Sequence, residues 1–265
     1  MTSGQIILRD IAKRTTTTTT TRQDAESKIA TAFGYTANDL SSLPEKTNLG
    51  LSCGNPVAHA NLKAGETVVD LGSGGGIDVI LAARKVGPDG RAIGIDMTNE
   101  MINLATRNAK KTDLTNISFI ETSITSIPLP DSSVDCIISN CVINLVPKSD
   151  KPRVFCEIAR LLTPGGRVAL SDILAKRELP EDIVSDMALY VGCIAGADQV
   201  VEYREWLEDA GFRGRDLNLY KESSYLGLGS CCGSGGSGQV AEYADVDFNG
   251  WAGSFQIYAV KSDSG

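Results

Sequence analysis

Short runs of β-branched and apolar residues alternate with segments of helical periodicity from residue 67 onwards. The β-rich runs are residues 67–71, 91–95, 117–121, 134–139 and 167–174. The helical segments between them are residues 77–86, 99–111 and 153–162. Strands that alternate with helices in this way predict βαβ crossovers and a mostly parallel sheet with helices on both faces.

The N-terminal flank, residues 1–66, differs from this core in its pattern. Seven consecutive threonines at residues 15–21 have no helical period, and we interpret them as a surface linker. A helical pattern starts at Asp24, and a loop that carries Cys53 follows it. We expect residues 1–66 to form a cap on a ligand-binding core of residues 67–175.

The C-terminal flank, residues 176–265, predicts further helices and strands. The expected elements are a helical insert at residues 181–190, a helix at 202–210 and two strands near 215–220 and 255–260. A glycine- and serine-rich stretch between the two strands carries Cys231 and Cys232 and has the composition of a flexible loop. The predicted fold is therefore an α/β, Rossmann-like sheet of seven strands, the last of them antiparallel.

Composition excludes several classes of protein. The chain has 25 Lys and Arg against 33 Asp and Glu, so its net charge of −8 argues against binding to nucleic acid. No apolar run reaches the roughly 18 residues that a membrane span needs, and the N-terminus does not have the pattern of a secretory signal. We expect a cytoplasmic protein whose seven cysteines are reduced.

A glycine loop follows the first predicted strand. Asp70 precedes it, and Gly72, Ser73, Gly74 and Gly76 form it. Glycines at a strand-to-helix turn let a ligand approach the backbone, and Asp96, at the end of the second strand, is placed to bind ribose hydroxyls. The spacing differs from the dinucleotide pattern, and Asp70 would repel a pyrophosphate but attract an ammonium group. This favours S-adenosylmethionine over a nicotinamide cofactor, and over a turn without a ligand.

Several blocks of the sequence have the pattern of a known family. They are residues 48–56 (NLGLSCGNP), 94–98 (GIDMT), 139–147 (SNCVINLVP), 171–173 (SDI) and 192–197 (GCIAGA). With the glycine loop, these blocks make residues 48–213 similar to the arsenite methyltransferase family, a branch of the class I S-adenosylmethionine-dependent methyltransferases. Similarity over the ends of the chain is looser.

The resemblance implies methyl transfer from S-adenosylmethionine to trivalent arsenic held by cysteine thiolates. By motif position, Cys53 and Cys193 match two of the arsenic-binding cysteines. The third usual position falls at residues 249–251, which hold no cysteine, and Cys231 and Cys232 are the candidate replacements. The family also implies glutathione or thioredoxin as the thiol reductant and a thiol conjugate of arsenic as the substrate.

The resemblance also assigns further cofactor contacts. They are Met97, Ile124, Thr125, Asn140 and Val142. Two features depart from the family pattern: no cysteine precedes Cys53, and Ser123-Ile124-Thr125 stands where many members have an acidic residue beside the adenine.

The chemistry of arsenic methylation suits the scarcity of bases in this chain. Methylation of oxygen, nitrogen or carbon generally needs a base to remove a proton. The single histidine, His59, is interpreted as a surface or structural residue. Arsenic bound by thiolates keeps a lone pair and has no proton to lose, so positioning can supply most of the catalysis.

The remaining cysteines have structural interpretations. We expect Cys136 and Cys156 to fill the core, and Cys141 to shape the loop after its strand. Two other functions stay open: methylation of a small organic acceptor, and binding of arsenic without catalysis. Loss of Cys193 would spare the first of these, and loss of Asp96 would spare the second.

Overall fold

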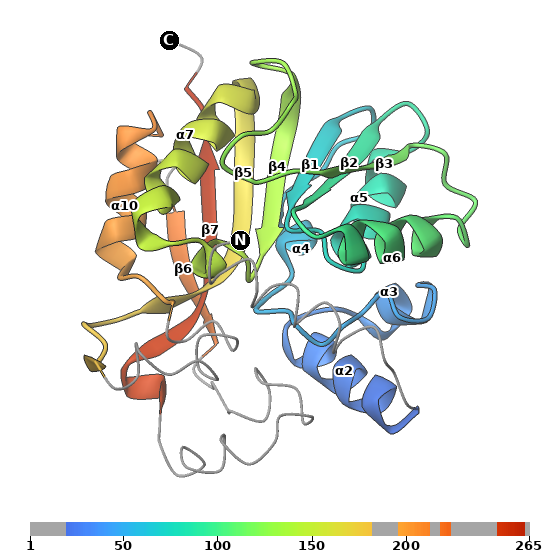
Figure 1. The fold of residues 1–265 in the computed structure, drawn as a ribbon, viewed down its shortest axis with the longest axis horizontal. Coiled ribbons are helices and arrows are strands. Elements are labelled where there is room, and N and C mark those ends of the chain that lie inside the picture. Colours follow the sequence, from blue (N-terminus) through green and yellow to red (C-terminus); the bar gives the residue numbers. More distant parts are fainter. Residues whose placement is uncertain (1–19, 182–195, 213–217, 224–247, 263–265) are drawn as a thin grey trace.

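The computed structural model describes residues 20–181, 196–212, 218–223 and 248–262, which form a seven-stranded sheet with helices on both faces (Figure 1). The strand order is β3-β2-β1-β4-β5-β7-β6. The strands are β1 (Thr67–Leu71), β2 (Arg91–Asp96), β3 (Ile117–Glu121), β4 (Val134–Asn140), β5 (Leu162–Ala175), β6 (Asn218–Ser223) and β7 (Ala252–Val260). The strands β1 to β5 are parallel, whereas β7 pairs antiparallel with both β5 and β6. The predicted fold class is confirmed.

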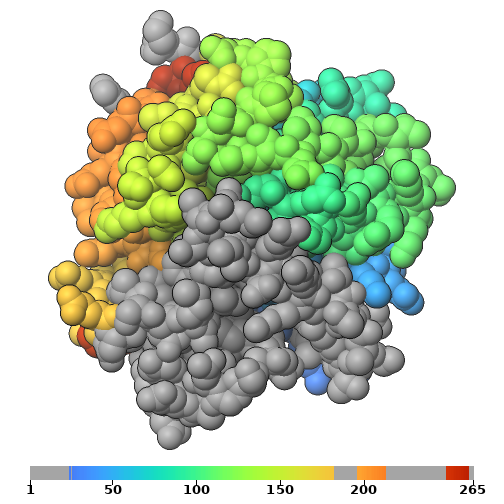
Figure 2. All heavy atoms as spheres, in the orientation of Figure 1, coloured from blue at the N-terminus to red at the C-terminus, as the bar shows by residue number. Residues whose placement is uncertain are grey.

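Two hydrophobic layers enclose the sheet because successive side chains of a strand point to opposite faces. On one face, Val69 and Ile137 pack against α7 (Lys151–Leu161) and α10 (Val200–Asp209). On the other face, Val68 and Ile138 pack against α4 (Pro56–His59) and α5 (Ile77–Val86). In the space-filling view, α10 lies at one side of the molecule, and the residues around α6 (Asn99–Ala109) lie at the other (Figure 2).

The N-terminal segment lies beyond the carboxyl ends of the parallel strands. Its helices are α2 (Thr20–Ala32) and α3 (Ala37–Ser41) (Figure 1). The Asn55 amide donates to the Gly34 carbonyl at 3.1 Å, which holds the loop after α2 against the start of α4. None of the described helices is long and apolar enough to cross a bilayer.

Some boundaries differ from those that the sequence predicts. The threonine run is not a linker throughout, because Thr20 and Thr21 form the start of α2. Threonine is less favourable than alanine in a helix by less than about 1 kcal/mol per residue. The helix-forming stretch that follows can therefore include two threonines at its start. The predicted insert at 181–190, apart from its first residue, and the Cys231-Cys232 loop lie outside the described residues.

Residues 163–166, which separate the predicted helix at 153–162 from the predicted strand at 167–174, lie inside β5. Val134 pairs with Leu162 and Cys136 with Arg167, so residues 163–166 bulge out of the ladder. Gly165 has a φ of 73°, which glycine adopts without strain. The strand therefore begins directly after α7, five residues before its predicted start.

Arg167 connects β5 to the segment before β1. Its guanidinium donates to both carboxylate oxygens of Glu66, at 2.8 and 2.7 Å, and to the carbonyls of Ala60 and Asn61. The side chain is buried. A paired guanidinium with four acceptors is well satisfied, and without it the Glu66 carboxylate would keep only the hydrogen bond from the Lys63 N–H at 2.8 Å.

We predict that Arg167→Met lowers the free energy of unfolding by about 3–5 kcal/mol, because it leaves the Glu66 carboxylate without its buried partner. Urea denaturation of the full chain measures this change. The control is Arg91→Met at the exposed start of β2, which should shift stability by no more than about 0.5 kcal/mol. Equal effects of the two substitutions would contradict the prediction.

Candidate active site at the carboxyl edge of the sheet

The glycine loop after β1 has no room for a side chain at Gly72. Gly72 has a φ of 77°, and a Cβ atom there would lie 2.3 Å from a Val142 methyl group. The N–H groups of Gly72 and Ser73 both donate to the Ile95 carbonyl at 2.8 Å, which ties the loop to β2. Gly76, with a φ of 88°, is the N-cap of α5. The loop is therefore fixed against β2, with Val142 packed directly against Gly72.

Asp96 lies at the end of β2 and faces the glycine loop. One carboxylate oxygen accepts from the Gly74 N–H at 3.1 Å, and the other accepts from the N–H and the hydroxyl of Thr98 at 2.9 Å. Burial raises the pKa of Asp96, and the hydrogen bonds from Thr98 and Gly74 oppose that rise. Met97, the next residue, is 37% exposed. The geometry places both Asp96 and Met97 at the carboxyl edge of the sheet, beside the glycine loop.

Three carboxylates gather beneath this edge: Asp70, Asp78 and Asp96. Burial raises the pKa of Asp70 well above its usual range, and the charges of Asp78 and Asp96 raise it further. The pKa of Asp78 is raised to about 6 by burial. No lysine or arginine in the described parts of the chain forms an ion pair with any of the three. Uncompensated carboxylates of this kind favour a positively charged ligand.

Asp78 was not anticipated from the sequence. It stands in the first turn of α5, and the residues after it in this helix are mostly apolar and buried. A buried carboxylate at a helix start is stabilised by the free N–H groups and the dipole of the helix. An aspartate inside an otherwise apolar helix start was the signal that could have found it.

The loop after β3 carries the predicted adenine-side residues. Ile124 is buried, and the hydroxyls of Ser123 and Thr125 lie 2.8 Å apart. These side chains therefore have fixed positions at the same edge as Asp96. Their contact with a cofactor stays a prediction.

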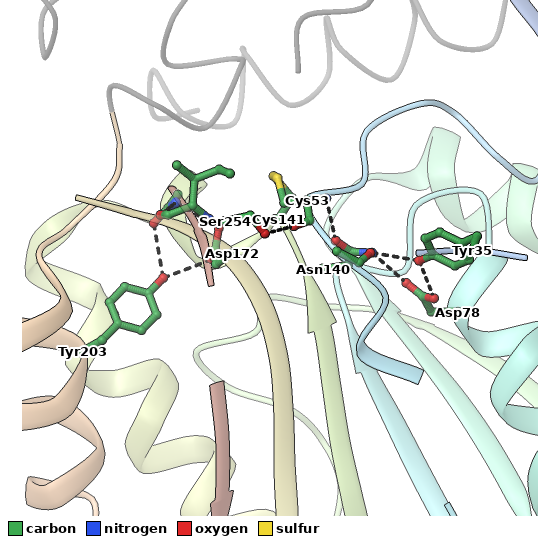
Figure 3. The surroundings of a disulfide bond; sticks show 11 residues. Tyr35, Cys53, Asp78, Asn140, Cys141, Asp172, Tyr203 and Ser254 are labelled. Carbon is green, nitrogen blue, oxygen red and sulfur yellow. Dashed lines mark hydrogen bonds between the residues drawn. A yellow bond between two sulfur atoms is a disulfide. The ribbon is translucent and has the colours of Figure 1, made fainter. Parts of the chain in front are cut away.

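Cys53 and Cys141 form a disulfide at the end of β4 (Figure 3). Their Cα atoms lie 5.4 Å apart although 88 residues separate them in the chain. The expectation that the cysteines are reduced is therefore wrong for this pair. Cys141 shapes its loop, as predicted, with a left-handed φ of 59° and an N–H bonded to the Ser171 carbonyl. Its contact with Cys53 comes from the tertiary structure.

The backbone of Cys53 is held on both sides. Its N–H donates to the Asn140 side-chain oxygen at 2.9 Å, and its carbonyl accepts from the Ser254 hydroxyl at 2.5 Å. Asn140 ends β4, and Ser254 lies on β7. The Asn140 amide also donates to the Gly54 carbonyl at 2.8 Å. The structure thus gives Asn140 a role in holding the cysteine loop, and its predicted cofactor contact remains untested.

The other cysteines have different environments. Cys136 is fully buried in β4, and burial raises its thiol pKa to about 12, in agreement with a core role. Cys156 is exposed on α7, so the prediction that it fills the core is wrong. The buried stripe of that helix consists of Val154, Phe155, Ile158 and Leu161, and residue 156 falls off this stripe. Cys193, Cys231 and Cys232 lie outside the described residues.

His59 lies at the end of α4 and is half-buried. Burial lowers its pKa, and the charge of Lys85 lowers it further. Its Nε2 atom is buried and bonds to no described residue. The sequence predicted a surface or structural residue, and the structure places it partly in the interior.

The structure describes only the end of the segment that carries Cys193. The Lys151 ammonium, at the start of α7, donates to the Gly196 carbonyl at 2.7 Å and pairs with the Asp198 carboxylate. Since α7 follows β4, its first residue lies at the same edge of the sheet as Cys141. Cys193 is three residues from Gly196, a span of at most about 10 Å.

The fold and this edge define a Rossmann-like protein with a glycine loop, an aspartate after the second strand and a cysteine pair. The chain belongs to the methyltransferase domain family, which matches residues 62–211. An arsenite methyltransferase of Halobacterium salinarum is 45% identical over 201 residues, which are 76% of this chain and 51% of that protein. The human arsenite methyltransferase is 37% identical over 139 residues, 49% of this chain and 36% of that protein.

A solved structure has the same fold. The arsenic (III) S-adenosylmethionine methyltransferase of Chlamydomonas reinhardtii superposes with a TM-score of 0.67 at 30% identity, covering 86% of this chain and 73% of that chain. The predicted resemblance to arsenite methyltransferases is confirmed. The chain spans about half the length of the Halobacterium protein and less of the human one.

We predict that the chain purified without reductant yields a disulfide-linked pair of peptides, one with Cys53 and one with Cys141. The two thiols lie side by side in the folded protein, so oxidation joins them to each other. Peptide mass spectrometry before and after dithiothreitol checks this. Cys156, as the exposed control, should be alkylated in both samples. Free alkylation of Cys53 in the unreduced sample would contradict the pairing.

Proposed function

We propose that the chain is an arsenite methyltransferase, which transfers a methyl group from S-adenosylmethionine to trivalent arsenic bound by cysteine thiolates. The observation that carries this proposal is the position of the Cys53–Cys141 pair. Val142, the residue after Cys141, packs against Gly72 of the ligand loop. Two sulfur atoms thus stand beside the loop that would hold the cofactor.

The residues present fit S-adenosylmethionine. When bound, this cofactor supplies a methyl group on a positively charged sulfur. Asp96 keeps acceptor capacity for ribose hydroxyls, and the uncompensated carboxylates of Asp70 and Asp78 favour a ligand with an ammonium group. The buried Ser73 hydroxyl of the glycine loop bonds to no described residue. A buried hydroxyl of this kind calls for a partner, which the described part of the chain does not supply.

Reduced Cys53 and Cys141 would bind arsenic as thiolates. Thiolates are soft ligands and prefer soft, thiophilic centres. The pinned backbone of Cys53 fixes one of the two ligands, and the left-handed turn at Cys141 fixes the other. We propose Cys193 as the third ligand, because the Lys151–Gly196 hydrogen bond anchors its segment at the same edge. Cys231 and Cys232 are further candidates, as the sequence suggested.

The disulfide supports a need for an external thiol reductant. Two molecules of a thiol such as glutathione, or one reduced thioredoxin, would convert the disulfide to two thiols and become a disulfide themselves. The two cysteines can then exchange with a thiol conjugate of arsenic. We propose that the chain acts where such reductants are present, as in the cytoplasm.

Positioning would be the main contribution of the protein to catalysis. Thiolate-bound arsenic keeps its lone pair and has no proton to lose, so the acceptor needs no general base. A reaction without a general base suits this chain, because its single histidine is half-buried at the end of α4 and takes no part in the proposed reaction. Holding two reactants in a productive orientation can supply about 7–11 kcal/mol of a barrier.

We predict that the purified chain makes methylated arsenic from arsenite, S-adenosylmethionine and glutathione, and that Cys53→Ser reduces the rate at least about a hundredfold, since one fixed ligand of the acceptor is lost. Chromatography with mass detection of arsenic species measures the products. Cys156→Ser, at the exposed thiol, should keep the rate of the unchanged chain. Cofactor binding without any methylated arsenic would overturn the proposal and favour an organic acceptor.

We predict that Asp96→Ala weakens S-adenosylmethionine binding about tenfold or more, because hydrogen bonds to a charged group contribute about 1.5–3 kcal/mol. Isothermal titration calorimetry measures the affinity. The control is Asp89→Ala, an exposed residue in the turn between α5 and β2. An unchanged affinity in Asp96→Ala would show that the ligand lies elsewhere.

A further inference from the structure

A buried chain of hydrogen bonds leads from α5 to the backbone of Cys53 (Figure 3). The Tyr35 hydroxyl donates to one carboxylate oxygen of Asp78 at 2.7 Å. The Asn140 amide donates to the Tyr35 oxygen at 2.9 Å and to the other Asp78 oxygen at 3.3 Å. The Asn140 oxygen then accepts from the Cys53 N–H. Four residues from four segments of the fold are joined in this way.

The chemistry of the groups indicates which atom donates in these hydrogen bonds. The Cys53 N–H can only donate, so the Asn140 oxygen faces it and the Asn140 NH₂ group faces Tyr35 and Asp78. The Tyr35 oxygen accepts from that NH₂ group and is also hydrogen-bonded to the Ser52 side chain, while its own proton is donated to Asp78. The same NH₂ group is shared between Tyr35, Asp78 and the Gly54 carbonyl. Both oxygens of Asp78 therefore face donors, and an ionised Asp78 accepts these hydrogen bonds better than a protonated one.

We propose that Asp78 and Tyr35 are positioning residues for Cys53. They hold the Asn140 amide in the one orientation that fixes the cysteine loop, and they do so without touching the reacting atoms. The value of this role for arsenic binding rests on the proposed function. The hydrogen-bond chain also couples α5, directly below the glycine loop, to the cysteine that would hold the acceptor.

The surroundings of Asp78 make this role sensitive to acid. Burial raises the pKa of Asp78 to about 6, while the hydrogen bonds from Tyr35 and Asn140 lower it. The facing titratable groups are Tyr35 from the cap and Asp70 from β1, with Asp96 of β2 acting on Asp70. As the pH falls through about 6, Asp78 takes up a proton, and the series of hydrogen bonds from Asp78 to Cys53 loses its terminal acceptor.

The test measures how often the Cys53 loop opens. Cys53 is 2% exposed, so a maleimide reaches its thiol only after the loop leaves Asn140. The full chain is used in a Cys141→Ser background, which prevents the disulfide, and labelling of Cys53 is followed by peptide mass spectrometry. At pH 7.5, we expect Tyr35→Phe to label about fivefold faster and Asp78→Asn about tenfold or more, according to the ordinary strength of neutral and charged hydrogen bonds.

Tyr203→Phe is the matched control. Tyr203 is fully buried, and its hydroxyl also donates to a buried carboxylate, Asp172, at 3.0 Å, so this substitution removes a hydrogen bond of the same kind between α10 and β5. This control should label at the rate of the background protein. Acceleration of the same size in Tyr203→Phe would overturn the specific role of Tyr35.

The pH profile separates positioning by an ionised Asp78 from simple packing. The ratio of the Tyr35→Phe rate to the background rate cancels the titration of the thiol itself. We expect this ratio to fall towards one between pH 7.5 and 5, because protonation of Asp78 then disrupts the same hydrogen bonds in the background protein. A ratio near one at every pH, or a raised ratio that does not change with pH, would overturn the proposal. Tyr35→Phe keeps its ring, so the test stands even where Asp78→Asn fails to fold.

The outcome is independent of the proposed function. Labelling needs neither arsenic nor cofactor, so a chain that methylates no arsenic can still confirm the positioning role. Unchanged labelling in a chain that does make methylated arsenic would reject the positioning role and leave the proposed function intact.

Discussion

The hydrogen bonds of the Asn140 side chain are the interaction on which the candidate site depends. This amide stands at the end of β4, directly before Cys141, and binds the backbone on both sides of the Cys53 side chain, at the Cys53 N–H and the Gly54 carbonyl. The loop that carries Cys53 has no regular secondary structure of its own. Besides the disulfide itself, this amide and the Ser254 hydroxyl therefore hold the loop in position relative to Cys141.

Charge compensation distinguishes the site from the rest of the fold. Glu66 has Arg167 as its partner, and Asp198 has Lys151, so these buried carboxylates are neutralised within the protein. Asp70, Asp78 and Asp96 have no ion-pair partner among the described residues, and burial raises the pKa of each. A protein gains no stability from such an arrangement. A ligand that brings positive charge, as in the proposed function, would compensate these carboxylates.

Local patterns predicted much of the fold. The bounds of β1 and α5 agree with the periodicity, because each element is built from a continuous amphipathic or apolar run between clear turn residues. The prediction failed where a long-range ladder overrides a local turn, as in β5, which starts five residues early and carries its turn as a bulge. It also failed for Cys156, where a shift of one position decides between the buried and the exposed side of α7.

The sequence by itself determined the order of strands and helices, the glycine loop and the position of Asp96, since each depends on neighbours a few residues away. Only the tertiary structure decided that Cys53 meets Cys141 across 88 residues and Ser254 across 201. Neither Asp78 nor Tyr35 was predicted from the sequence, and only the tertiary structure shows the hydrogen bond between them. Such contacts depend on which strands lie side by side and how the cap folds over their ends. Periodicity does not encode this information, because it reports the buried face of an element and not the element that covers it.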